Sequence, residues 1–130
     1  MRVQESRENY LEAILMLHRK HGYVRSVDVA NHLGFSRPSV SVAMSNLRKL
    51  GLITTDEHGL LLLTPKGLRE AESVLERHTL ITNWLVGLGV NEQTAAEDAC
   101  RIEHVISQES FECIRRHVDQ REKGEAKGEA

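Results

Sequence analysis

A helix-turn-helix pattern in residues 26–53 constrains the fold of this chain more than any other feature. The segment reads SVDVANHLGFSRPSVSVAMSNLRKLGLI, and two stretches with apolar residues at helical spacing flank Gly34. Ser36 is placed to cap the second helix, whose first turn tolerates Pro38. Two short helices joined by a glycine-containing turn form a helix-turn-helix. The pattern therefore predicts that the second helix is the recognition helix of a DNA-binding unit.

A predicted hairpin follows this second helix directly. The string LITTDEHGLLLLT has β-compatible residues on both sides of a DEHG turn. A hairpin immediately after a recognition helix makes the unit a winged helix-turn-helix with a two-stranded wing. We also expect Ser26 to cap the first of the two short helices.

Helical patterns cover most of the remaining chain. Residues 6–21 have apolar residues at helical spacing, and Thr64 and Pro65 open another helix. The chain stays helical after His78, with an amphipathic helix opened by Asn91 and a short last helix at FECIRRHV. The sequence therefore predicts a mainly α fold class, with the winged helix-turn-helix at the N-terminus and a helical region after it.

The charged residues are distributed unevenly. With His neutral, residues 19–69 carry eight basic and three acidic side chains (+5), residues 1–18 sum to −1, and residues 70–130 to −6, for a net charge of −2. A cationic block next to an anionic one indicates a nucleic-acid-facing module joined to a module with another task.

The residues that we expect to contact DNA lie on or near the predicted recognition helix. Arg37 could bind a base edge or a phosphate. Arg48 and Lys49 could bind the DNA backbone or interact with the helix dipole. A three-helix packing unit that never touches nucleic acid is the alternative, which the agreement of turn, cap, hairpin and charge disfavours. The candidate DNA-binding residues are Ser26, Ser36, Arg37, Pro38, Ser39, Ser41, Arg48 and Lys49.

The composition indicates a soluble cytoplasmic protein. The N-terminus carries several charged residues, which a signal peptide's apolar segment does not. No apolar run approaches the roughly 20 residues that span a bilayer. The two cysteines, without a secretory signal, suggest free thiols in a reducing compartment.

The string EDACRIEHVIS contains a candidate metal motif. Cys100, Glu103 and His104 stand at i, i+3 and i+4, so a helix would bring a thiol, a carboxylate and an imidazole to one face. The alternative is a buried Cys with a solvated Glu–His pair. A metal would need further ligands, because three residues on one helix do not complete a coordination shell. The other candidate donors are Asn9, Glu12 and His78.

An enzyme that uses Cys100 as a thiolate and His104 as its base is a third reading of the same motif. Neighbours on one helix rarely form a substrate cleft, and no glycine-rich or oxyanion-type loop accompanies them. We therefore expect a binding protein and not an enzyme.

From about residue 5 to 118, the chain resembles the metal-dependent repressors that include the diphtheria toxin repressor and the manganese transport regulator. The strings that carry the resemblance are ENYLEAI, the helix-turn-helix up to GLI, GLLLLTPKG, the RH that ends at His78, and CRIEH. The resemblance implies a homodimer that binds a palindromic operator when loaded with a divalent metal. It also implies a DNA-binding domain over residues 1–70 and a helical metal-binding and dimerisation domain over 71–120. The composition of residues 121–130 predicts a disordered charged tail.

Carried over from the family, the metal ligands would be Asn9, Glu12, His78, Cys100, Glu103 and His104. Manganese members have a carboxylate at the first position and iron members a Met, whereas this chain has the weaker amide of Asn9. Cys100 follows the iron members, and Glu12 follows the manganese members.

The ancillary site of the iron members is not expected here. Thr82 stands where that site has a Glu, and Ala96 stands where it has a second His. Because this sequence stops near residue 130, we do not expect the additional SH3-like domain of the iron members either.

The thiolate of Cys100 bears on the choice of metal. Thiolates favour Fe(II), Co(II) or Zn(II) over Mn(II), so we expect Fe(II), with Mn(II) next, and one or two ions per subunit. The predicted function is a metal-responsive transcriptional repressor. The alternative is a metal-independent winged-helix regulator with a degenerate site, which Asn9 and Thr82 favour.

Overall fold

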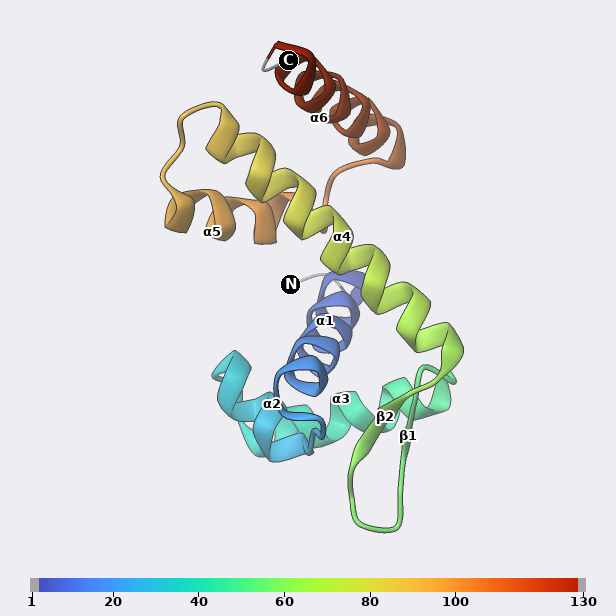
Figure 1. Cartoon of the computed structure of the whole chain (residues 1–130). Coiled ribbons are helices and arrows are strands. Elements are labelled where there is room, and N and C mark those ends of the chain that lie inside the picture. Colours follow the sequence, from blue (N-terminus) through green and yellow to red (C-terminus); the bar gives the residue numbers. More distant parts are fainter. Residues whose placement is uncertain (1–2, 129–130) are drawn as a thin grey trace. The chain divides into compact units, whose positions relative to one another are not determined.

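The computed structural model describes residues 3–128, with side chains described for residues 6–121. Within this range the chain is mainly helical and contains one two-stranded antiparallel sheet (Figure 1). The elements are α1 (Val3–His21), α2 (Ser26–Leu33), α3 (Arg37–Lys49), β1 (Ile53–Thr55), β2 (Leu61–Leu63), α4 (Pro65–Gly87), α5 (Glu92–Ile102) and α6 (Gln108–Gly128). The mainly α fold class with an N-terminal winged helix-turn-helix is confirmed.

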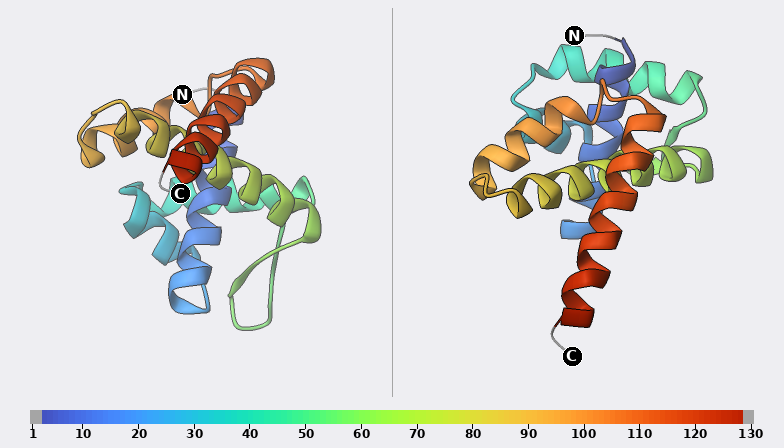
Figure 2. Two further views of the ribbon diagram at one scale, coloured as in Figure 1. Left: turned by 45° about the horizontal axis from the view of Figure 1, so that its top comes forward. Right: turned by 90° about the horizontal axis from the view of Figure 1, so that it is seen from above.

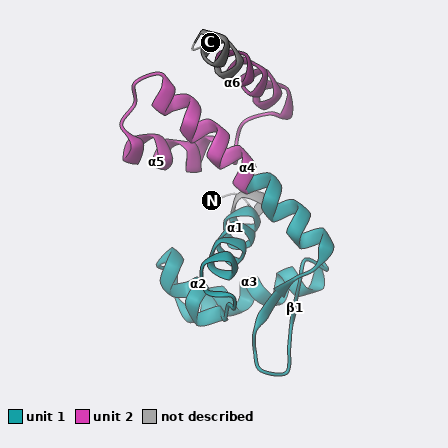
Figure 3. Ribbon diagram, in the orientation of Figure 1, with its two compact units in different colours: residues 1–74 teal, residues 75–130 magenta. Residues whose placement is uncertain are grey.

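The chain divides into two compact units, residues 1–74 and 75–130 (Figure 3). The division falls within α4, and so does the expected boundary at residue 70, so neither position is a linker between helices. None of the helices described here combines the length and apolar character that a membrane span requires.

In the first unit, α1 contacts α2, α3 and β2. The apolar stripe of α1 is buried as its spacing predicts, and Tyr10 meets Phe35 of the α2–α3 turn with the ring centroids 5.9 Å apart. Each helix therefore buries one face against the others. The fully buried apolar side chains of this unit include Leu11, Ile14, Val29, Met44, Leu52 and Leu61.

The turn between α2 and α3 follows the predicted pattern. Gly34 has φ of +72°, a conformation that glycine adopts without the Cβ penalty of other residues. Ser36 caps α3, because its Oγ accepts a hydrogen bond from the backbone N–H of Ser39 at 3.3 Å.

The expected cap of α2 was wrong. Arg25 is the N-cap residue, and Ser26 is the first helical residue. The carboxylate of Asp28 accepts a hydrogen bond from the Arg25 backbone N–H at 2.9 Å. The carboxylate of Asp28, three residues after Arg25, binds that N–H and favours Arg25 as the N-cap, so the helix begins one residue earlier than a Ser26 cap would place it.

The predicted wing is confirmed. Strands β1 and β2 pair antiparallel, with Ile53 opposite Leu63. In the connecting turn, Oδ1 of Asp56 accepts backbone N–H bonds from His58 and Leu60, both at 2.9 Å. The hairpin loop extends beyond the helices of its unit in Figure 1 and in the left view of Figure 2.

Thr64 joins the wing to α4. Its hydroxyl donates to the carbonyl of Gly51 at 2.7 Å and accepts from the N–H of Gly67 at 3.0 Å. Gly67 lies so close to the backbone of Leu52 that a Cβ there would overlap the Leu52 carbonyl oxygen. The start of α4 is thus fixed directly against the end of α3 and the start of the wing.

The second unit consists of the rest of α4 with α5 and α6. Asn91 caps α5 as predicted, since its Oδ1 accepts from the N–H of Gln93 at 2.9 Å. Arg115 of α6 pairs with Glu76 of α4 and lies over the ring of Phe111 at 5.0 Å. The buried apolar side chains here are Ile81, Ala95, Ala99, Phe111 and Val118.

Residues 121–128, where the composition predicts a disordered charged tail, continue α6 as one uninterrupted helix (Figure 2, right). Most residues between 108 and 128 are Glu, Lys, Arg, Gln or Ala, which have high helix propensity. A helix that is already nucleated extends through such residues at little cost. Residues 129 and 130 lie outside the described part of the chain.

Candidate metal centre and DNA-binding face

The predicted metal motif straddles the end of α5. The helix ends at Ile102, Glu103 is its C-cap with φ −58° and ψ −26°, and His104 lies in the following turn. The expectation that all three residues lie within a helix was therefore wrong. Because Glu103 keeps helical dihedral angles, the donor atoms of Cys100, Glu103 and His104 still lie within 4.8 Å of one another.

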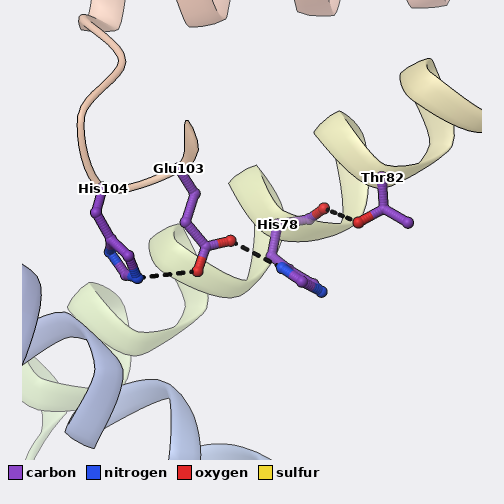
Figure 4. A network of polar contacts seen from close by, with 4 residues as sticks. All are labelled: His78, Thr82, Glu103 and His104. Carbon is purple, nitrogen blue, oxygen red and sulfur yellow. Dashed lines mark hydrogen bonds and ion pairs between the residues drawn. The ribbon is translucent and has the colours of Figure 1, made fainter. Parts of the chain in front are cut away.

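Glu103 is the centre of this cluster. It is a charged residue only 1% exposed, and its carboxylate lies between two imidazoles (Figure 4). Its Oε2 is 2.9 Å from Nδ1 of His78, and its Oε1 is 3.3 Å from Nε2 of His104. Among the described residues, no hydrogen bond of standard geometry reaches Oε1. A buried carboxylate with an unsatisfied oxygen is costly, and a bound cation would remove that cost.

The burial of the three motif residues excludes the alternative of a buried Cys with a solvated Glu–His pair. Cys100 is exposed, whereas the side chain of His104 is 5% exposed and that of Glu103 is fully buried. A thiol, a carboxylate and an imidazole are the ligand types of divalent transition metals. The residues present therefore fit such an ion, with Cys100 on the solvent side of the cluster.

Thr82 does not take part in this cluster. Its hydroxyl donates to the carbonyl of His78 in the same helix at 2.7 Å (Figure 4). A threonine hydroxyl engaged with its own helix is a poor substitute for a carboxylate ligand. Ala96 on α5 has no donor atom.

Asn9 and Glu12 lie one turn apart on α1, as their spacing predicts. Glu12 is buried and Asn9 is half-buried. Both belong to the first unit, whereas the cluster around Glu103 belongs to the second. Their role as ligands is a proposal and not a structural finding.

Most of the candidate DNA-binding residues are exposed on α3. Arg37, Pro38, Ser39, Ser41 and Lys49 are exposed, and the half-buried Ser26 is the first residue of α2. The exposed Ser36 has a structural role as the cap of α3.

Arg48 also has a structural role, because its Nη1 donates to the hydroxyl of Thr55 on β1 at 2.9 Å. The sequence alone does not indicate this contact. It links the recognition helix to the wing within the same unit.

Two residues of α3 differ from the predicted burial pattern. Leu50 was expected in the buried stripe, but it is 48% exposed at the end of the helix. Val42 is 62% exposed and was not considered as a functional residue. It could have been found, because it is the one valine of this helix that does not fit the buried stripe.

Two family models match this chain. The DNA-binding domain of the iron-dependent repressors matches residues 2–60, and their metal-binding and dimerisation domain matches residues 64–128. The transcriptional regulator MntR of Escherichia coli O6:H1 is 36% identical over 108 residues, which cover 83% of this chain and 70% of that protein. An uncharacterised helix-turn-helix regulator of Methanocaldococcus jannaschii is 32% identical over 115 residues, 87% of this chain and 92% of that one.

Solved structures match as well. IdeR of T. acidophilum has a TM-score of 0.76 at 29% identity and covers 86% of this chain and 53% of its own. A manganese-dependent transcriptional repressor, in complex with manganese, has a TM-score of 0.80 at 26% identity. The match covers 87% of this chain and 52% of the repressor's chain. The chain thus spans about half the length of these solved proteins.

A winged helix-turn-helix followed by a helical unit with a cluster of metal-ligand residues defines a metal-dependent transcription regulator. The two family models and the 36% sequence identity to MntR show which family within this class includes the chain. The chain belongs to the iron-dependent repressor family, whose members are transcription regulators and not enzymes.

Proposed function

We propose that this chain is a repressor that binds a palindromic operator as a homodimer when loaded with a divalent metal. The observation that carries the proposal is the buried Glu103, whose carboxylate lies between His78 and His104 with Cys100 nearby. A DNA-binding unit and a metal-ligand cluster in one chain give the two sites that such a switch needs.

The proposed ligands are Asn9, Glu12, His78, Cys100, Glu103 and His104. The proposal for Asn9 and Glu12 rests on their donor types and on the family resemblance. The two oxygens of Glu103 face different imidazoles, which supports a site for one or two ions sharing that carboxylate. Cys100, Glu103 and His104 with Asn9 would hold one ion, and Glu12 with His78 the other.

The proposed metal is Fe(II), with Mn(II) next. The thiol of Cys100 supports this order, because thiolates prefer Fe(II), Co(II) or Zn(II) to Mn(II). The solved relative with bound manganese and the relatives named MntR support Mn(II) as the second candidate. The ion itself would supply the positive charge that neutralises Glu103 and the thiolate.

The proposed switch depends on ligands from both units. If α1 and the Glu103 cluster hold one ion, binding would favour a single arrangement of the DNA-binding unit relative to the dimerisation unit. In that arrangement the two recognition helices of a dimer would lie roughly 34 Å apart, one turn of DNA. The metal acts only through its differential affinity for the two arrangements.

Glu103→Gln tests the metal centre. Glutamine keeps the size of the side chain but removes its charge, so metal affinity should fall by more than the roughly 10- to 100-fold that loss of an outer-shell partner costs. Isothermal titration with Mn(II) and Co(II) measures this, and circular dichroism checks that the variant is folded. Thr82→Val is the control, because Thr82 adjoins His78 without offering the cluster a donor. Metal-dependent operator binding by Glu103→Gln at wild-type metal concentrations would contradict the proposal.

Arg37→Ala tests the DNA-binding face separately. Arg37 is exposed at the start of α3, so its loss should weaken operator binding by about 1–3 kcal/mol if it contacts a base. Metal affinity should stay at the wild-type value, because Arg37 is an exposed residue at the start of α3, whereas the proposed ligands lie on α1 and α4 and at the end of α5. Fluorescence anisotropy with a labelled operator measures the first effect. Wild-type DNA affinity in this variant would remove Arg37 from the proposed interface.

A further inference from the structure

Val42 lies on the side of α3 that faces away from the core of its own unit. At about 100° per residue, it is turned roughly 200° from the buried Val40 and Met44. It is 62% exposed, whereas Val40 and Met44 are at most 1% exposed. A β-branched apolar side chain at this position neither packs in the core nor favours the helix.

The helix-surface neighbours of Val42 are mostly polar. Pro38 and Ser39 precede it by four and three residues, and Ser45 and Asn46 follow at three and four residues. Of these, Pro38, Ser39 and Asn46 are exposed and Ser45 is half-buried. Val42 is therefore an exposed apolar group at the centre of a side that also carries hydrogen-bonding side chains.

Neither arginine of α3, Arg37 or Arg48, lies within one helical turn of Val42. Arg48, on the flank, donates to Thr55 of the wing. The wing turn itself carries Asp56 and Glu57, which would repel phosphates. An isolated valine among polar and charged side chains is also too small to be a protein-docking patch.

We propose that Val42 reads the 5-methyl group of a thymine, so that each operator half-site has a T·A pair at the position that Val42 faces. The thymine methyl is the one apolar group on the major-groove edges of the four bases. This inference rests on the proposed function, because it assumes that α3 enters the major groove.

The test uses an operator selected from a random duplex library with the Mn(II)-loaded protein. Each thymine is then replaced in turn by deoxyuridine, which lacks only the methyl group. We expect one position per half-site where this replacement weakens binding about fourfold, since burial of one methyl or methylene is worth about 0.8 kcal/mol. At thymines that contact other residues, the effect of the deoxyuridine replacement on binding should be the same for the wild-type protein and for Val42→Ala.

Variants connect that position to Val42. Val42→Ala should bind the thymine and deoxyuridine operators equally well at that position. Leu50→Ala should keep the fourfold difference, because Leu50 is also exposed (48%) but lies at the C-cap of α3, eight residues from Val42. Equal binding of both operators by the wild-type protein, or retained discrimination by Val42→Ala, would overturn the inference. If the library yields no duplex that binds in a metal-dependent way, the proposed function fails instead.

Discussion

At the residue scale, the carboxylate of Glu103 is the feature of the second unit that most favours a bound cation. Glu103 is buried against two imidazoles, with an oxygen that receives no hydrogen bond among the described residues. A side chain in this environment is costly to an ion-free protein and well suited to a cation. Cys100 differs from the other members of the cluster because it is exposed.

Cys100→Glu should change the metal preference. A carboxylate is a harder ligand than a thiolate, so affinity for Mn(II) should rise relative to Co(II) and Fe(II). The wild-type Co(II) complex should show thiolate-to-cobalt charge-transfer absorption, and the variant should lack it. Competition titrations give the ratio of affinities. Cys113→Ser is the matched control, since Cys113 is the other exposed cysteine. An unchanged metal ratio together with an unchanged Co(II) spectrum would show that Cys100 is not a ligand.

At the element scale, the junction between the wing and α4 determines how the first unit is built. Thr64 bridges Gly51 and Gly67, and the backbone of Leu52 lies directly against Gly67. The start of α4 is therefore held by hydrogen bonds and by close backbone contact. No side chain fits at Gly67 without moving one of these segments.

Gly67→Ala should destabilise the protein although alanine is the better helix former. The added Cβ overlaps the Leu52 carbonyl, and overpacking of this kind typically costs about 1–3 kcal/mol. Gly87→Ala, in the same helix, is the control. A Cβ at Gly87 would meet only Arg121 Nη1 at 3.7 Å, so the expected change is within about 0.5 kcal/mol. Urea unfolding measures both, and equal stability of the two variants would contradict the proposed packing.

The elements that were predicted well are those with local signals. The cap at Ser36, the turn at Gly34 and the cap at Asn91 each depend on residues within one turn of the chain, so the sequence shows them. The proximity of Cys100, Glu103 and His104 could be predicted for the same reason, although α5 ends before Glu103.

What could not be predicted depends on competition or on tertiary burial. The side chain that caps α2 is that of Asp28 and not that of Ser26. The residue pattern alone does not show which of two possible N-cap positions the helix uses. Leu50 is exposed at the C-cap, because α3 ends at Lys49, and periodicity does not reveal where the buried stripe stops. The contact of Arg48 with Thr55 requires the wing to be folded beside α3.

At the scale of the whole molecule, the two units have different chemistry. The first carries the basic recognition helix, and the second carries the acidic helices and the Glu103 cluster. Linkage requires that if metal strengthens operator binding, operator DNA strengthens metal binding by the same factor. The account therefore predicts a coupling that can be measured from either side.

The most direct measurement is the operator affinity of the wild-type protein by fluorescence anisotropy, with saturating Fe(II) or Mn(II) and then with chelator. The account predicts tighter binding with metal, by about 5- to 150-fold for a coupling of about 1–3 kcal/mol. Both titrations are made at one salt concentration, because phosphate contacts make the affinity depend steeply on salt. Equal affinity with chelator and with metal would contradict the account.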